Sequence, residues 1–285
     1  MQRIIFTNAR GQSVELKSSA PFLLQSVDGL GDVDADTQTQ KSPFQDGSTY
    51  IDSVLQERPI SLEIVILASD TSTLLQRRQC LAAVFNPKLG PGTLRYENGE
   101  VVREIEAVPD GVPVFPSGRE NRGPFFQKAL VNLLCPNPFW KSPEITEEPT
   151  FEPLFQFPFE GVFEIGMQRD NRIIVNDGDA PAPLYIEFFG PAVNPIIINR
   201  TTGEFIKVNQ TLQEGEVMKI DTTPGRKSVY FVQPDGTERN VFNWIDLNSS
   251  FFQLVVGENE IEYSADSDIQ GAIVNISYRK LYNAV

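Results

Sequence analysis

The sequence predicts a mainly β protein of two domains. Its 285 residues are enough for about two domains of ordinary size. One stretch alone has helical spacing, whereas short apolar runs bounded by turn residues recur throughout. We therefore expect a β-sandwich-like domain with one helix and an extended arm or hairpin over 1–145. A β-sandwich or jelly roll is expected over 146–285, joined by a linker at about 143–160.

The first half contains several runs in which apolar and polar residues alternate. Such alternation is typical of a strand with one buried face, because successive side chains point to opposite sides. Glycine-containing connections such as Asn98-Gly99 separate some of these runs and favour hairpins. The predicted elements are a hairpin over 2–17, a strand over 58–67, a hairpin over 92–110 and a strand over 125–135.

The single helix is predicted at about 70–85. Ser69 or Asp70 can serve as its N-cap, because a short polar side chain can accept a hydrogen bond from a free amide of the first turn. Apolar residues then recur at helical spacing as far as Phe85. Pro87 ends the pattern, since proline disfavours helical geometry in the preceding residue.

No helical period continues beyond about residue 160. Turn residues instead punctuate the second half at short intervals, and the runs between them alternate as strands do. The runs 184–188 and 272–278, for example, each place one set of apolar side chains on a single face. This rhythm predicts an all-β sandwich.

Two polar stretches, 28–50 and 109–124, are too long for simple turns and too polar for a core. We interpret 28–50 as the first candidate for an arm that contacts a neighbouring subunit, and 109–124 as the second. A disordered or lid-like loop is the alternative. Removal of 30–48 is expected to abolish assembly and leave a folded monomer. The candidate arm residues are Asp28, Asp32, Thr39, Phe44 and Tyr50.

The stretch "LVNLLCPNPFWKSPE" begins as an apolar strand and is broken by Pro136 and Pro138. Proline has no amide N–H, so a β-ladder is expected to stop after Cys135. We predict that Phe139 and Trp140 then pack back on the first domain and fix the angle at which the chain leaves it. These five residues form the predicted domain hinge; the alternative is a binding surface.

Composition excludes several kinds of chemistry. The chain has no histidine, which removes Ser-His-Asp and Cys-His nucleophile arrangements and histidine-based metal sites. "DVDADTQ" resembles a calcium loop, but Thr37 and Pro43 stand where glycine and glutamate belong. Cys80 and Cys135 form no CxxC pattern and are expected to be buried and unpaired. We expect no catalytic, cofactor-binding or metal site.

Charge and hydropathy limit the partners. A net charge of −14 argues against nucleic acid as a bound ligand, because phosphate binding needs clustered Lys and Arg. No apolar run approaches the ~18 residues needed to span a bilayer. The N-terminal residues lack the apolar core of a signal peptide. We expect assembly in a cytoplasm and no membrane partner.

Several stretches, taken in order, resemble the siphophage distal tail protein (Dit) family. They include "IIFTNARGQSVEL", "QDGSTYIDSVLQERPISLEI", "FNPKLGPGTLRYE" and "LLCPNPFW" in the first half. The second half offers "VNDGDAPAPLYIEFFGPAVNPIIINRTTGEFIKVNQTLQEGEVMKIDT", "SSFFQLVVGENEIEYSA" and "VNISYRKLY". Together these stretches cover most of the chain, and their order and spacing make the resemblance specific.

The resemblance implies a structural protein of the virion, at the distal end of a long phage tail. Such proteins form a ring, typically a hexamer, through their N-terminal half, and present a galectin-like sandwich from their C-terminal half. The ring links the tail tube protein to the tail-associated (Tal, or fibre) protein and to receptor-binding or accessory tail-tip proteins. DNA passes through the channel without being bound specifically, and no enzyme activity is implied.

Two other functions stay open at this level. One is a carbohydrate- or receptor-binding β-sandwich protein; some Dit members carry an inserted sugar-binding module, for which this chain has no surplus length. The other is a glycosidase that works through two carboxylates, whose separation the sequence does not show.

Overall fold

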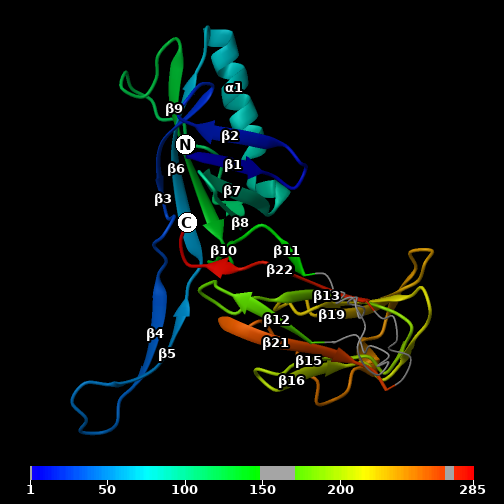
Figure 1. Ribbon diagram of the computed structural model, residues 1–285. Helices are drawn as coiled ribbons and strands as arrows, with labels where there is room; N and C mark the ends of the chain where they lie inside the picture. Colours follow the sequence, from blue (N-terminus) through cyan, green and yellow to red (C-terminus); the bar gives the residue numbers. More distant parts are fainter. Residues whose placement is uncertain (1, 148–170, 267–272) are drawn as a thin grey trace, which may run out of the picture. The chain divides into compact units, whose positions relative to one another are not determined.

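The computed structural model describes residues 2–147, 171–266 and 273–285 (Figure 1). The chain divides into two compact units. Unit 1 comprises Met1–Pro143 together with Tyr282–Val285, and unit 2 comprises Glu144–Leu281. Strands dominate both units, and one α-helix lies in the described part of the chain. The expected mainly β, two-part fold with one helix is confirmed.

Unit 1 is built on a nine-stranded sheet with the order β23-β10-β8-β7-β1-β2-β3-β6-β9. β8 also pairs with β9, so the sheet closes on itself. The strands are β1 (Arg3–Thr7), β2 (Ser13–Lys17), β3 (Phe22–Asp28), β6 (Arg58–Leu67), β7 (Gly92–Asn98), β8 (Val101–Pro109), β9 (Phe126–Cys135), β10 (Trp140–Lys141) and β23 (Leu281–Tyr282). This closure leaves few free edges.

The core of unit 1 follows from the alternation seen in the sequence. Every second residue of β6 from Arg58 to Ile66 is buried, as the two-residue period of a strand requires. β6 pairs along its whole length with β9, from Arg58 opposite Cys135 to Leu67 opposite Phe126. This pair of long strands forms an extended part of the unit 1 sheet.

Helix α1 (Thr71–Val84) packs against β6 and β2 and buries Leu74 and Leu81. The Asp70 carboxylate caps it by accepting from the Thr73 amide at 2.9 Å. Hydrogen bonds from Thr73, the largest cause, hold the pKa of Asp70 down at about 2. Phe85, which ends the helix, stacks on Phe6 with ring centroids 4.6 Å apart. The helix predicted at 70–85 is confirmed.

The end of the chain differs from the sequence-based division. Residues 282–285 belong to unit 1, although the prediction placed them in the second domain. The reason is local pairing: β23 lies beside β10, and the guanidinium of Arg103 stacks over the Tyr282 ring at 3.8 Å. Val285 also packs against the unit 1 core. The chain thus crosses between the units twice.

Unit 2 is a β-sandwich with a six-stranded and a four-stranded sheet. The first has the order β11 (Ile145–Glu147), β22 (Ile273–Tyr278), β13 (Leu184–Phe189), β18 (Val217–Asp221), β19 (Ser228–Val232) and β20 (Glu238–Asn240). The second has the order β12 (Asn171–Asn176), β21 (Gly257–Ser264), β15 (Ile196–Asn199) and β16 (Glu204–Lys207). A two-residue pair, β14 (Ala192–Val193) and β17 (Thr211–Leu212), completes the described strands.

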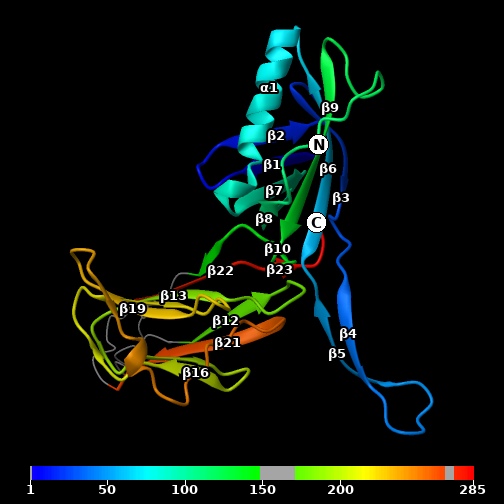
Figure 2. The same cartoon turned by 180° about the vertical axis from the view of Figure 1, so that it is seen from behind.

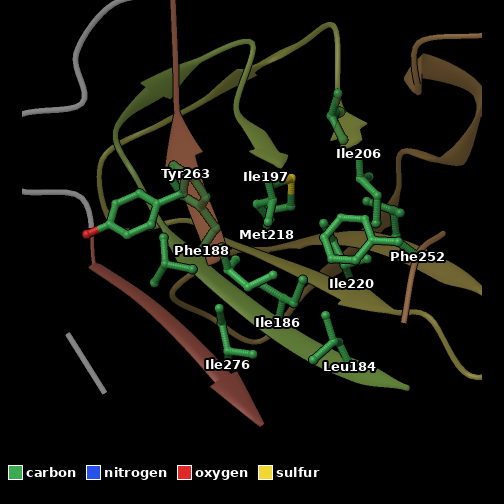
Figure 3. Close-up of a cluster of buried hydrophobic side chains, with 14 of the residues drawn as sticks. Leu184, Ile186, Phe188, Ile197, Ile206, Met218, Ile220, Phe252, Tyr263 and Ile276 are labelled. Carbon is green, nitrogen blue, oxygen red and sulfur yellow. The ribbon is translucent and has the colours of Figure 1, made fainter. Parts of the chain in front are cut away.

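Apolar side chains from both sheets fill the space between them (Figure 3). Phe188 of β13 meets Tyr263 of β21 edge to face, with centroids 6.0 Å apart. Face-to-face packing of two sheets explains why the strands of this half alternate so regularly. The predicted linker at about 143–160 falls largely on residues 148–170, outside the described residues; the part before it forms β11.

No helix in the described ranges is long and apolar enough to cross a membrane.

Candidate assembly surface: the arm and its root

A separate two-stranded hairpin extends from unit 1 between β3 and β6. It consists of β4 (Ala35–Gln40) and β5 (Thr49–Leu55), and we call residues 33–55 the arm (Figures 1 and 2). All of β4 and all of β5 except Leu55 are exposed. Within the described chain, each strand of the arm pairs with the other alone. An isolated two-stranded hairpin is marginally stable in water, so we expect a partner to support it.

The arm carries apolar side chains that are largely exposed. The exposed fractions are 61% for Tyr50, 56% for Ile51 and 48% for Val54. Phe44, at the turn between the strands, is fully exposed and has a positive φ of 63°. A bulky residue in the left-handed region is strained, and such strain tends to mark functional positions. These features are typical of an interaction element.

A β-bulge sets which arm residues share a face. Gln38 lies opposite Asp52, but Thr39 lies opposite Tyr50, so Ile51 has no partner across the hairpin. The extra residue shifts the alternation of β5, which brings Tyr50 to the same face as Thr39 and Ser53. The bulge thus places the Tyr50 ring on the same face of the hairpin as Thr39.

Residues 29–32, which connect β3 to the arm, form its root, and this root is sterically tight. Gly29 has a φ of +90°, a conformation that glycine adopts without strain. A Cβ at this position would lie 2.1 Å from the Pro59 carbonyl oxygen. The chain can therefore turn from β3 into the arm only with glycine at 29.

Arg58 is fully buried beneath this root. In the described part of the chain its guanidinium donates to four main-chain carbonyls. The acceptors are Pro138 O (2.8 Å), Gly29 O (3.0 Å), Asp32 O (3.2 Å) and Asn283 O (2.5 Å). Burial lowers the pKa of the guanidinium, and the nearby Cys135 and Asp32 oppose that shift. The dipoles of these four carbonyl groups stabilise the positive charge of the buried guanidinium.

The residues predicted as a domain hinge lie beside this arginine. Trp140 is fully buried; its Nε1–H donates to Leu30 O at 3.1 Å, and its ring meets Tyr96 edge to face at 6.4 Å. Phe139 is only partly buried, and its amide donates to the Asn137 side chain at 3.1 Å. Trp140 thus packs in the unit 1 core.

The remaining hinge residues form the turn between β9 and β10. Cys135 ends β9, and burial raises the pKa of its thiol to about 12. Pro136 is exposed, whereas Pro138 is partly buried and offers its carbonyl to Arg58. The chain leaves unit 1 after Pro143. The role of these residues as a hinge stays a prediction.

The five predicted arm residues fall into two groups. Thr39, Phe44 and Tyr50 lie on the hairpin and are exposed. Asp28 ends β3, opposite Ser61, and Asp32 lies at the root, where its carbonyl accepts from Arg58. A deletion of 30–48 would therefore disturb the buried root as well as the arm.

The second candidate stretch, 109–124, is bonded in part to β9, and its role as an arm stays a prediction. Val114 and Leu130 exchange two main-chain hydrogen bonds of 2.9 Å, and the Lys128 amide donates to Asn121 O at 2.8 Å. Some main-chain groups of the segment are therefore bonded to β9, while Val112 and Val114 keep exposed side chains.

Sequence reasoning missed Arg58 altogether. An arginine before a strand normally indicates an exposed end, and burial of a charge is rare unless its hydrogen bonds are satisfied. One signal was available: Arg58 precedes Ile60, Leu62 and Ile64 in steps of two, which places it on their buried face.

Two sequence profiles match the chain. "Phage tail protein RIFT-related domain" matches residues 9–135, and "Siphovirus-type tail component, C-terminal domain" matches residues 177–282. The chain belongs to the siphophage distal tail (Dit) protein family. As a Dit protein it is a structural component of the phage tail hub, located in the tail of the virion, and it assembles with other tail components.

Solved structures show the same fold. The crystal structure of the SPP1 Dit protein, described as a paradigm of hub adsorption apparatus in phages that infect Gram-positive bacteria, is similar with a TM-score of 0.69 and 14% identity. The alignment covers 99% of each chain. The phage P2 baseplate, in its activated conformation with Ca, contains a chain similar with a TM-score of 0.60 and 10% identity, over 100% of this chain and 99% of that one. No curated protein sequence matches this chain.

These relatives are structural tail proteins rather than enzymes. As a Dit protein, the chain has its functional features in surfaces that meet other subunits. In unit 1 the arm is an exposed hairpin, and its role in contacts between subunits stays a prediction.

Proposed function

We propose that this Dit protein forms a closed, hexameric ring at the distal end of the tail, with the arm as the contact between neighbouring copies. The ring joins the tail tube protein to the tail-associated fibre protein and to receptor-binding or accessory tip proteins. DNA passes through its channel without specific binding. The subunits are made and assemble in the host cytoplasm.

The arm is the observation that supports this proposal. A ring requires each subunit to contact the next through two different surfaces, and a projecting element meets that need. Exposed apolar residues on the arm would be buried on contact, which stabilises by about 25 cal/mol per Å². Because the unit 1 sheet closes on itself, the arm has few strand edges to join there and is expected to bind mainly through side chains.

The net charge of −14 supports a channel that does not hold DNA. Acidic side chains on a channel wall repel the phosphate backbone within a Debye length, about 8 Å at physiological salt. Tight binding to DNA of any sequence by assembled rings would contradict this part of the proposal.

Excision of the outer arm is expected to abolish ring formation. Residues 38–52 are replaced by an Asn-Gly turn, so that the opposed pair Thr37 and Ser53 closes a short hairpin. This design retains Leu30 and Asp32, whose carbonyls hold Trp140 and Arg58. Native mass spectrometry and negative-stain electron microscopy should show monomers where the unmodified chain forms rings, with an unchanged melting temperature.

A point variant tests whether the ring depends on the arm itself or on any exposed apolar residue of unit 1. Tyr50→Ser should weaken the ring, whereas Val101→Ser, which alters another exposed apolar residue of unit 1, should not. Rings formed equally well by the excised protein would refute the assignment of the arm.

A cluster of exposed aromatic side chains on unit 2 favours a second candidate function, the binding of carbohydrate or of a receptor. Phe242 and Trp244 are 43% and 39% exposed, and Phe242 stacks on Phe251 with centroids 5.6 Å apart. The Arg239 guanidinium lies 5.4 Å from the Trp244 ring, and Leu247 is fully exposed. Aromatic and arginine side chains are enriched at binding hot spots.

Binding of the full chain to host cell-envelope polysaccharide tests this candidate. Trp244→Ala should reduce binding about tenfold or more, the loss typical of a hot-spot residue. Tyr185→Ala, at a similarly exposed ring on β13 of unit 2, should leave it unchanged. Absence of polysaccharide binding by the unmodified chain would remove the candidate, whether or not rings form.

A further inference from the structure

Three chain segments that are far apart in sequence converge on the Arg58 guanidinium. The first is the arm root, through Gly29 O and Asp32 O; the second is the β9–β10 turn, through Pro138 O; the third is the C-terminal tail, through Asn283 O. All three lie in unit 1. A planar fork with fixed donor directions can hold several carbonyls at once in one geometry.

Two of these segments are the connections between the units. The chain leaves unit 1 after Pro143, shortly after Pro138, and returns at Tyr282, directly before Asn283. Both connections are therefore fixed to the same side chain that holds the arm root. The Trp140 indole also connects β10 to the arm root, since its N–H donates to Leu30 O.

Burial makes this junction sensitive to loss of the charge. Arg58 is fully buried, so its N–H groups and their carbonyl acceptors have no water to replace a lost partner. Without the guanidinium, four carbonyls in three segments would be left without that donor. The segments would then gain freedom together, because one group serves all of them.

We propose that Arg58 couples the arm root to both connections with unit 2, so that the three segments move as one body. The position of the arm root therefore limits the positions at which the chain leaves unit 1 and returns to it. In the ring proposed above, on which this last step rests, capture of the arm by a neighbour would also restrict the orientation of the C-terminal unit.

Hydrogen exchange of the monomeric full chain tests the coupling. Arg58→Met should speed exchange about tenfold or more in all three segments, 29–32, 139–141 and 282–285, the size expected when a local opening is made easier. The amides of β1 and β7 serve as the internal reference. Arg58→Lys should give the same pattern, since an ammonium lacks the planar fork. Arg95→Met, at an exposed and ion-paired arginine, should leave all three segments unchanged.

A truncation that removes residues 283–285 covers the case in which Arg58→Met does not fold. It takes away one acceptor of Arg58 without a change in any strand, and Val285→Ala, which removes the core contact of the tail but keeps Asn283 O, is its control. Exchange should then rise at the arm root and at the β9–β10 turn, although neither segment was altered. Faster exchange confined to the new C-terminus, or a rise in only one of the three segments of Arg58→Met, would overturn the proposal.

These measurements need no ring. A chain that forms no rings but shows the three-segment response would contradict the proposed function alone. A chain that forms rings without that response would contradict the coupling alone.

Discussion

Trp140→Ala is expected to lower the free energy of unfolding of unit 1 by about 3–5 kcal/mol, the usual cost of a large aromatic removed from a core. Trp140 is fully buried, its indole N–H donates to Leu30 O, and its ring packs edge to face on Tyr96. The substitution leaves a cavity and an unsatisfied carbonyl at the arm root. Chemical denaturation, followed by fluorescence and circular dichroism, measures the change.

Phe139→Ala is the matched control for this variant. Phe139 is the neighbouring aromatic residue but is only partly buried, so its loss should cost about 1 kcal/mol. We also expect Trp140→Ala to loosen the orientation of the two units, measurable by small-angle X-ray scattering. An unchanged melting temperature together with a loss of carbohydrate binding would instead identify this stretch as a binding surface.

Much of the fold could be predicted because local rules and tertiary packing agree. In β6, alternating apolar residues predicted one buried face, and the structure buries that face against the core. For α1, the Asp70 cap and the proline at 87 marked the ends within a residue or two. These signals are carried by neighbouring residues, so one sequence suffices to read them.

The arm was recognised by its length and polarity, and an extended arm or hairpin was expected, but the bounds of its two strands were not predicted. "ADTQTQ" has no apolar face, so the alternation that identifies other strands is missing from β4. A hairpin forms there because its main-chain groups pair with β5, which the composition does not reveal. The same reasoning did not reveal that several main-chain groups of 109–124 are bonded to β9.

The contacts around Arg58 could not be predicted, since they depend on residues separated by up to 225 positions. Neither the closure of the sheet through β8 and β9 nor the return of the tail to unit 1 leaves a local trace. Burial of an arginine becomes acceptable only when four carbonyls converge on it, and that convergence is a property of the whole unit.

Gly29→Ala should be the most damaging small substitution in the arm root. It combines a positive φ of +90° with a Cβ that would lie 2.1 Å from the Pro59 carbonyl oxygen, a main-chain atom that cannot move independently. We expect a loss of about 3–4 kcal/mol, from backbone strain and from the shift that the clash forces on β6. Equilibrium unfolding in urea measures it.

Gly47→Ala isolates the steric part of this effect. Gly47 lies in the arm turn with a φ of +74°, but, apart from its chain neighbours, no atom of the described residues lies within 4 Å of an added Cβ. This variant should cost about 1 kcal/mol, the strain of the left-handed conformation alone. The difference between the two variants therefore measures how tightly the root is packed on β6. Equal losses would mean that the root can move away from Pro59, and an arm root that moves so easily could not direct the arm toward a neighbouring subunit.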